Sequence, residues 1–332
     1  MSRAYHRRQG GINGATYSFY SARGLREYLP ANLDIFNRPH STIAQICLIY
    51  LNSKQVKAIP ANRPPDPSGT PFLEYSSLYW GVHAKRELSS CASSLALQLF
   101  QEYDAHISTR LLLNQEACNE YIDIDVVETS FLLNGLHCVS FFGIVQVVAA
   151  LLEMECYDIN GGDFWGTAPL AWAACNGHEE VVKILLEREA VDPDKPDNDG
   201  QTPLSRAAWN GHEGVVKILL GQEEVNPDMP NNSGNTPLSY TAWNGHEGVV
   251  KILLGREEAN PDKPDNYGKK PLSHGARNGH ERVVKIQLSP EEVNPDKPDN
   301  GGNSPLMHAA REGYRRVVQL LESHQGVTRD AA

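Results

Sequence analysis

The 332-residue chain is poor in positive charge and has no clustered cysteines. Its 41 aspartate and glutamate residues outnumber its 30 lysine and arginine residues, which gives a formal net charge of −11 at pH 7. A general nucleic-acid-binding protein needs a basic face to attract phosphate, so we do not expect this class. The six cysteines lie far apart and form no Cys-x-x-Cys pair. This spacing argues against a zinc site or a disulfide scaffold and favours buried thiols in a reducing compartment.

The motifs of common enzymes are also missing. The sequence contains no Gly-x-Ser-x-Gly, no His-Glu-x-x-His and no Gly-x-Gly-x-x-Gly after a strand pattern. The Gly-x-x-x-x-Gly-Lys-Ser/Thr loop that cradles nucleotide phosphates is absent as well. We therefore expect no catalysis, no cofactor and no small-molecule substrate.

Targeting and membrane signals are weak. No apolar stretch follows the basic N-terminal residues, so secretion is not expected. The expected location is the cytoplasm, with the nucleus as the alternative. Residues 131–152 are apolar enough to suggest a transmembrane helix, but Asn134, His137 and Gln146 interrupt the run, and we expect no membrane span.

The chain does contain a 34-residue repeat. Gly-His pairs recur at 177–178, 211–212, 245–246 and 279–280, and Gly313-Tyr314 follows at the same step. Thr-Pro-Leu or a variant of it precedes each pair, and Val-Val-x-Ile-Leu-Leu runs follow most of them. A repeat of this length is typical of a solenoid that stacks one helical unit many times.

Each part of the unit has a physical reason. Thr202 offers an oxygen to the free N–H groups of a starting helix, and Pro203 suits the first helical position. Gly211 can adopt the left-handed conformation that ends this helix and turns the chain. A second helix is predicted from about Glu213, and its apolar face is too broad for one unit to cover. The repeats must therefore stack.

These motifs resemble the ankyrin repeat. The resemblance implies an all-α solenoid of helix-turn-helix repeats with hairpin loops, which binds a partner protein of unknown identity and has no catalytic role. Tetratricopeptide repeats share the period but need an early tryptophan and a Leu-Gly pair, and they lack Thr-Pro-Leu. Five copies span residues 163–322, a degenerate copy covers 129–162, and 323–332 form a C-terminal tail. We number the five copies as repeats one to five.

A small helical domain is expected before the array. Residues 1–34 have no stable period and are predicted to be poorly ordered, whereas 35–128 read as helical with a Pro-rich loop at 60–71. Helices are predicted near 40–51, 72–83 and 87–103. A hydroxyl from Ser41 or Thr42 is expected to cap the first of them.

Residues 36–51 and 70–88 carry a second resemblance. They are similar to the helical region between a NACHT nucleotide-binding module and an ankyrin array in fungal NLR-like proteins. That kinship implies an alternative function, in which this chain is the sensor or regulatory part of a signal-transduction NTPase. The phosphate-binding loop of such a regulator is absent from the sequence.

Two repeated patterns could be mistaken for metal sites. Histidines 178, 212, 246 and 280 stand one to a repeat, and stacked helices set equivalent atoms about 10 Å apart, far beyond a shared zinc ion with ligands at about 2.0–2.1 Å. We expect each histidine to bond locally at its turn. An EF-hand reading of the loop near Gly200 would need Lys195 as the first ligand and Arg206 as the twelfth, so calcium is not expected either.

Function is then expected at the positions where the copies differ. In ankyrin proteins the hairpin tips and inner helices line the concave binding surface, and the resemblance implies that role here. The variable tip residues are Phe164, Trp165, Asp199, Gln201, Ser233, Asn235, Tyr267 and Lys269. The variable inner-helix residues are Trp172, Arg206, Trp209, Tyr240, Trp243, His274, Arg277 and Arg311. Trp, Tyr and Arg commonly anchor interfaces, but Trp172, Trp209 and Trp243 could equally pack between repeats.

Charge and stability should vary along the array. Residues 197–230 carry six acidic side chains against two basic ones, whereas 265–298 carry six basic against five acidic. Repeat four also departs from the pattern, with Lys270 in place of the capping threonine, Gly275 in place of alanine, and Gln287 in the apolar run. Each change costs helix or core stability, so we expect repeat four to open first. The last repeat should expose a polar outer face.

Overall fold

The computed structural model describes residues 38–59, 72–101, 106–108, 133–154, 156–289 and 293–330. The chain divides into two compact units, residues 1–135 and 136–332. Over the described ranges, regular structure consists of sixteen helices, two further helical residues at 107–108 and one isolated bridge residue, His106. This confirms the predicted all-α class. The segment 1–34 and the Pro-rich loop at 60–71 lie outside the described residues.

The first unit packs three longer helices around a small core. Helix α2 (Pro39–Leu51) contacts α4 (Leu73–Arg86) and α5 (Ser90–Phe100), and the short α3 (Lys54–Lys57) follows α2. Trp80 is fully buried, and its ring centroid lies 5.7 Å from that of Phe100. These helices occupy the three predicted segments.

The hydroxyl cap predicted for the first helix is wrong. Arg38 holds the N-cap position of α2 without a side-chain hydrogen bond, and Pro39 stands at the first helical position. Ser41 and Thr42 lie inside the first turn and are buried. The fixed φ of proline starts the helix without a hydroxyl. The third helix also begins later than predicted, because Ser89 caps α5 by accepting a hydrogen bond from the Ala92 amide at 3.1 Å.

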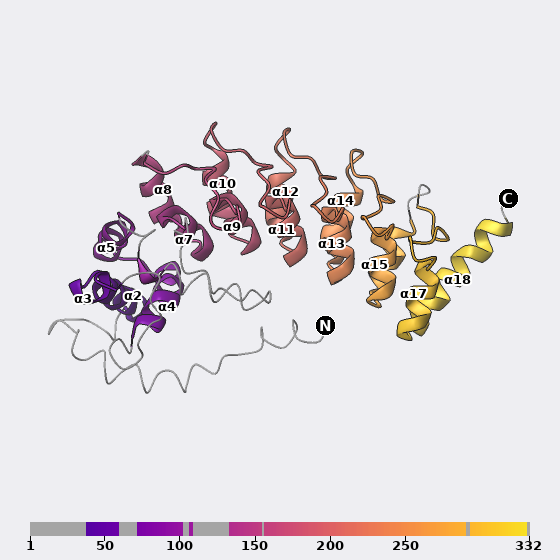
Figure 1. The fold of residues 1–332 in the computed structure, drawn as a ribbon, viewed down its shortest axis with the longest axis horizontal. Helices are drawn as coiled ribbons and strands as arrows, with labels where there is room; N and C mark the ends of the chain where they lie inside the picture. The colour runs from indigo at the N-terminus through magenta and orange to yellow at the C-terminus, as the bar shows by residue number, and fades with distance from the viewer. Residues whose placement is uncertain are drawn as a thin grey trace. The chain divides into compact units, whose positions relative to one another are not determined.

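The second unit is a stack of helix pairs, and its inner helices form one row (Figure 1). The inner helices are α7 (Gly135–Phe142), α9 (Pro169–Cys175), α11 (Pro203–Asn210), α13 (Pro237–Asn244), α15 (Pro271–Arg277) and α17 (Pro305–Glu312). The outer helices are α8 (Val145–Glu153), α10 (Glu179–Leu186), α12 (Glu213–Leu219), α14 (Glu247–Leu254), α16 (Glu281–Gln287) and α18 (Arg315–Asp330). Consecutive inner helices from α9 to α17 pack on one another, as do consecutive outer helices from α8 to α18.

The local signals act as predicted in repeat two. The Thr202 hydroxyl accepts a hydrogen bond from the Ser205 amide at 3.2 Å, and Pro203 begins the helix. Gly211 has φ of +77° and ends it. Ala207 and Ala208 are fully buried, because their small side chains let adjacent helices approach closely.

The repeated Gly-His pair joins each repeat to the next, and the local hydrogen bond expected for these histidines is wrong. A Cβ on Gly211 would lie 2.6 Å from Nδ1 of His246, so the imidazole occupies the space that the glycine leaves. The same ring donates from Nε2 to the Trp209 carbonyl oxygen at 2.8 Å. That carbonyl belongs to the last turn of an inner helix, where oxygens lack helical partners. His178, His212 and His280 repeat this arrangement.

Asparagines make a parallel connection between the hairpins. The backbone N–H of Asn232 donates to the Asp199 carbonyl oxygen, and the side-chain Nδ2 of Asn232 donates to the Asn198 carbonyl oxygen, both at 2.9 Å. Gly200 again makes room, since a Cβ there would lie 2.8 Å from the Asn232 side chain. Asn198, Asn266 and Asn300 form the equivalent bonds.

The array ends on a polar face, as predicted. The residues expected to face solvent, Arg311, Glu312, Arg315, Arg316, Gln319 and Glu322, are all exposed. Helix α18 runs through most of the segment expected to be a tail. None of the described helices is long and apolar enough to cross a membrane, and the apolar run near 131–152 contains the turn at Gly143 between α7 and α8.

Repeat four carries the expected defects. Lys270 makes no cap for α15; it is buried, and its ammonium forms an ion pair with Asp262. Gln287 is 2% exposed, and within the described part of the array neither its amide nitrogen nor its amide oxygen has a hydrogen-bond partner. Burying an amide without partners is costly.

Substituting Gly211→Ala should lower the free energy of unfolding by more than about 1–2 kcal/mol, the cost of a left-handed conformation for an L-residue, because the new Cβ also meets His246. Urea denaturation followed by circular dichroism measures the change. Gly255→Ala is the matched control: Gly255 has φ of −80° and is exposed, so its effect should stay within about 0.5 kcal/mol. Equal effects of the two substitutions would contradict the role given to the pair.

Substituting Gln287→Leu should raise the free energy of unfolding by about 1–3 kcal/mol, because it removes an unsatisfied buried amide. The control is Gln319→Leu on the exposed face of α18, which should change stability by less than about 0.5 kcal/mol. Denaturant titration of both variants measures their free energies of unfolding.

The same weakness should be visible in the parent protein. Amide hydrogen exchange is expected to be faster in α15 and α16 than in α11 and α12. Equal protection of the two repeats would show that repeat four does not open first.

Candidate functional site

The structure divides the sixteen predicted binding residues by exposure. The buried ones are Trp172, Tyr240 and His274. The exposed ones are Asp199, Ser233, Tyr267 and Arg311. The half-buried ones are Phe164, Trp165, Gln201, Arg206, Trp209, Asn235, Trp243, Lys269 and Arg277. The hairpin tips and the C-terminal end of the row therefore offer the most surface.

One set of variable positions is tied to the hairpin of its own repeat. Asp197 accepts hydrogen bonds at one oxygen from the amides of Asp199 and Gln201, and at the other from Arg206, nine residues later, with an Nε–O distance of 3.1 Å. The equivalent pairs are Asp163 with Trp172, Asn231 with Tyr240, Asp265 with His274, and Asp299 with His308. Position 172 and its equivalents vary because several chemically different groups can satisfy the hairpin residue. This spacing of nine is visible in the sequence, but it was missed because the partners differ in chemistry.

The balance between burial and hydrogen bonding differs among these carboxylates, and their pKa values shift in different directions. At Asp163 burial dominates and raises the pKa, and the hydrogen bonds from Thr167, Trp172 and Trp165 offset it only in part. At Asp265 burial also acts to raise the pKa, but the bond from His274 and the neighbouring amides outweigh it, and the pKa is lowered. Asp299 beside His308 behaves in the same way. Indole stays neutral, whereas imidazole can carry a positive charge.

The lowered and the raised pKa values change the free energy of unfolding in opposite directions as pH falls. The lowered pKa values of Asp265 and Asp299 mean that both stabilise the fold above the unfolded-state pKa of about 3.9. That contribution is lost as pH falls through the lower folded-state pKa. Asp163, with its raised pKa, favours the fold more as pH falls.

Aromatic rings connect neighbouring inner helices. The Trp209 ring centroid lies 5.1 Å from that of Tyr240 at an interplanar angle of 79°, and Trp243 lies 5.1 Å from His274. The Trp172 ring centroid lies 5.5 Å from that of Phe141, and these two rings meet edge-on at an interplanar angle of 77°. These contacts support the packing interpretation of the three tryptophans, although Trp209 and Trp243 keep part of their surface open to solvent.

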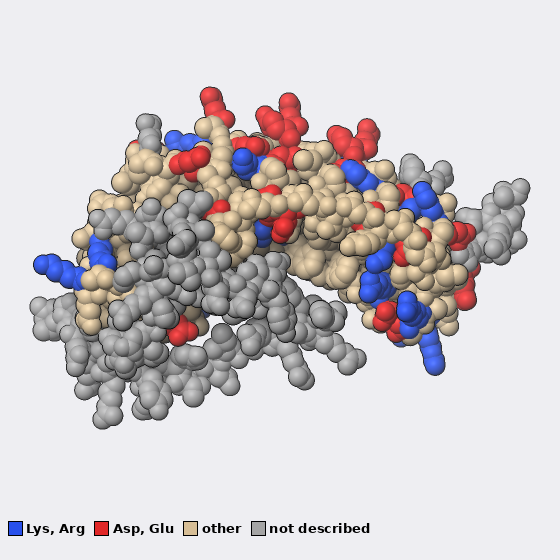
Figure 2. Space-filling model, viewed as in Figure 1, with Lys and Arg blue, Asp and Glu red and all other residues tan. Residues whose placement is uncertain are grey.

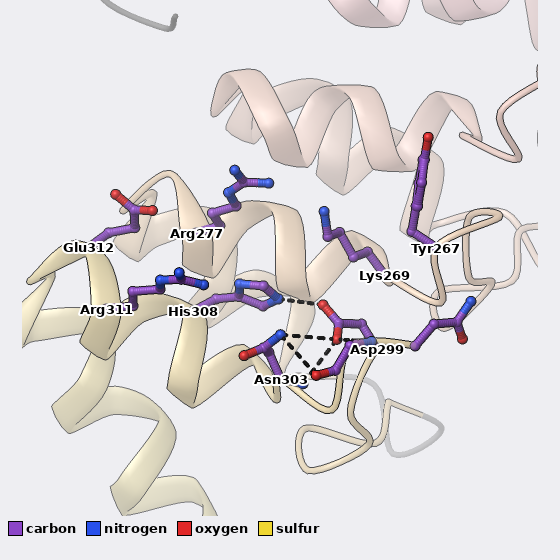
Figure 3. Close-up of a pocket in the computed structure, with 10 residues that line it drawn as sticks. Tyr267, Lys269, Arg277, Asp299, Asn303, His308, Arg311 and Glu312 are labelled. Carbon is purple, nitrogen blue, oxygen red and sulfur yellow. Dashed lines mark hydrogen bonds and ion pairs between the residues drawn. The ribbon is translucent and has the colours of Figure 1, made fainter.

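Four predicted residues meet at one cavity near the C-terminal end of the row. Tyr267 and Lys269 reach it from the hairpin before α15, and Arg277 and Arg311 reach it from the ends of α15 and α17 (Figure 3). The cavity measures about 630 Å³. It is also lined by Asp299, Asn300, Gly301, Asn303, His308 and Glu312.

The array is charged unevenly, as predicted. Acidic side chains project from the edge formed by the loops after α10, α12 and α14, and basic side chains gather over the C-terminal repeats (Figure 2). The exposed acids of those loops include Glu189, Glu223, Glu224, Glu257 and Glu258. Among the described residues, no group of three or more His, Cys, Asp or Glu is placed to hold a metal ion.

A family model described as ankyrin repeats (3 copies) matches the chain over residues 95–197, 136–231, 189–265, 222–297 and 238–330. No curated protein matches the chain. The matched residues include every helix of the stack and the whole of the cavity.

Substituting Trp172→His should lower the pKa of Asp163, because imidazole, which can carry a positive charge, replaces neutral indole as the donor. Carboxyl-carbon NMR titration measures this change. Asp265 in the same sample serves as the internal control and should keep its lowered pKa. An unchanged pKa of Asp163 in a folded variant would show that the partner does not control the titration.

Proposed function

This chain belongs to the ankyrin-repeat family, and we propose that it is a non-catalytic module that binds a partner protein through its inner helices and hairpin tips. Ankyrin repeats generally mediate protein–protein interactions. The proposal adds which surface of this chain does so.

The observation that supports the proposal is that each hairpin tip combines a fixed, hydrogen-bonded asparagine with a variable, exposed residue. Asn198, Asn232, Asn266 and Asn300 each donate a side-chain hydrogen bond to a carbonyl oxygen of the preceding hairpin, and these bonds keep the tips in register. The residue after each asparagine differs between repeats and is exposed: Asp199, Ser233, Tyr267 and Gly301. A fixed backbone that presents varied, solvent-facing side chains is suited to selective binding, since little entropy is lost when a partner docks.

The residue types on this surface fit an interface. Tyr267 is 66% exposed, the highest value among the large hydrophobic side chains of the described residues. Arg277 lines the same cavity from the opposite side (Figure 3). Tyrosine and arginine are among the residues that contribute most binding energy at interfaces.

We also propose, as a second candidate, that the chain acts as the sensor part of an NLR-like regulator. The segments that carry this resemblance fold into α2 and α4, which pack together in a helical unit of their own. A nucleotide-binding module encoded in the same reading frame upstream would support this candidate. An upstream sequence without a phosphate-binding loop would count against it.

A tip variant with Asp199→Lys, Ser233→Lys and Tyr267→Lys should lose the partner. All three residues are exposed, so the fold should survive, which circular dichroism checks. Partners captured from a lysate with the full chain are identified by mass spectrometry, purified and titrated by calorimetry. We expect affinity to fall by roughly tenfold or more, as for loss of interface anchors.

The control variant carries Glu223→Lys, Ser289→Lys and Gln319→Lys. These residues are exposed on the outer loops and outer helices, and the substitutions add the same charge as those of the tip variant. The control should bind as the parent does. Equal binding by the parent, tip and control variants would refute the proposed surface.

A further inference from the structure

The cavity between repeats four and five contains three cations from three different elements. Lys269 comes from a hairpin, Arg277 from the end of α15 and Arg311 from α17. Figure 3 shows Tyr267 and Lys269 on one side and Arg277, Arg311 and Glu312 on the other. We call these three cations, with Tyr267, the basic pocket.

The cations of the basic pocket differ from several other basic side chains of the array, which are paired with a carboxylate. Arg206, Lys263 and Lys270 form ion pairs with Asp197, Asp228 and Asp262. Within the described part of the chain, no carboxylate lies within ion-pair distance of Lys269, Arg277 or Arg311. The ammonium of Lys269 instead stands 5.6 Å from the centroid of the Tyr267 ring.

The carboxylates nearby offset only part of this charge. Asp299 is buried and is engaged by His308 at 2.8 Å and by the amides of Gly301 and Asn303 at 2.9 Å. Glu312 lines the cavity but forms no ion pair with its cations. Three cations against two carboxylates leave one net positive charge, with His308 counted as neutral.

We propose that the basic pocket binds side-chain carboxylates of an acidic segment in a partner protein. Arg277 and Arg311 would pair with carboxylate oxygens, for which the guanidinium fork is shaped. Lys269 adds a point charge, and the Tyr267 ring covers the aliphatic stem of the bound residue. This inference rests on the proposed function and names the chemistry of its partner.

Other anionic ligands fit less well. A phosphate group carries about −1.5 to −2 charges at pH 7, more than the single net positive charge of the pocket. Nucleic acid binding needs a run of phosphate contacts along a basic face, whereas repeat two, with six acidic residues against two basic, would repel the strand. A short acidic peptide needs only the pocket.

The test uses fluorescein-labelled hexaglutamate, and binding to the full chain is measured by fluorescence anisotropy. Hexaglutamine of the same length is the uncharged comparison. The parent should bind hexaglutamate at least tenfold more tightly than hexaglutamine. Binding should weaken as salt is added, because the pocket is open to solvent and its charges are screened.

Two variants locate the binding. Arg277→Gln with Arg311→Gln should weaken hexaglutamate binding by roughly tenfold, in the range for losing charge pairs at an interface. The control, Arg282→Gln with Arg316→Gln, removes the same charge from exposed outer-helix residues and should have no effect. Equal binding by the two double variants would overturn the proposal.

A gain of affinity separates this inference from simple unfolding. Glu312→Gln removes the exposed acid beside Arg311 and should tighten hexaglutamate binding by about twofold to fivefold, as expected for one exposed charge pair. A phosphoserine peptide or a single-stranded oligonucleotide that binds tenfold more tightly than hexaglutamate would overturn the choice of carboxylate. Failure with hexaglutamate, together with loss of the lysate partner in the tip variant, would refute this inference and leave the proposed function standing.

Discussion

A histidine ring packs against the turn glycine of the preceding repeat, and the rest of the array depends on this contact. The glycine ends the inner helix with a positive φ, and its missing side chain leaves the space that the imidazole fills. The imidazole then donates to a carbonyl of the last helical turn, where oxygens have no partner within the helix. One pair of residues thus satisfies the helix end, fixes the turn and sets the spacing of the stack. At the end of the array Tyr314 keeps the packing against Gly279.

A second framework holds the hairpins. The asparagine ladder joins neighbouring tips, and the hairpin Asp or Asn binds a donor nine residues later in the same repeat. The side chains of the exposed tip residues and the cations of the basic pocket belong to neither framework, and these are the groups to which we assign function.

Local signals were readable from the sequence, and long-range pairings were not. Thr202, Pro203 and Gly211 act within a few residues of themselves, so their roles in starting and ending a helix followed from residue type alone. Trp172 and His274 looked like surface residues because they vary, but each is buried against a hairpin carboxylate. Variation therefore marked a tolerant framework position as well as a binding position. Lys269, Arg277 and Arg311 were each identified from the sequence, but their convergence depends on how repeats four and five stack.

The most direct test of this account is the protonation state of the four repeated histidines. A carbonyl oxygen can only accept, so the Nε2 atoms of His178, His212, His246 and His280 must carry the proton. Long-range ¹H–¹⁵N NMR of the imidazoles should show the Nε2–H tautomer for all four, with Nε2 protons that exchange slowly with water. Imidazoles that are protonated at Nδ1, or that exchange as freely as a surface histidine, would contradict the Gly-His contact as the link between repeats.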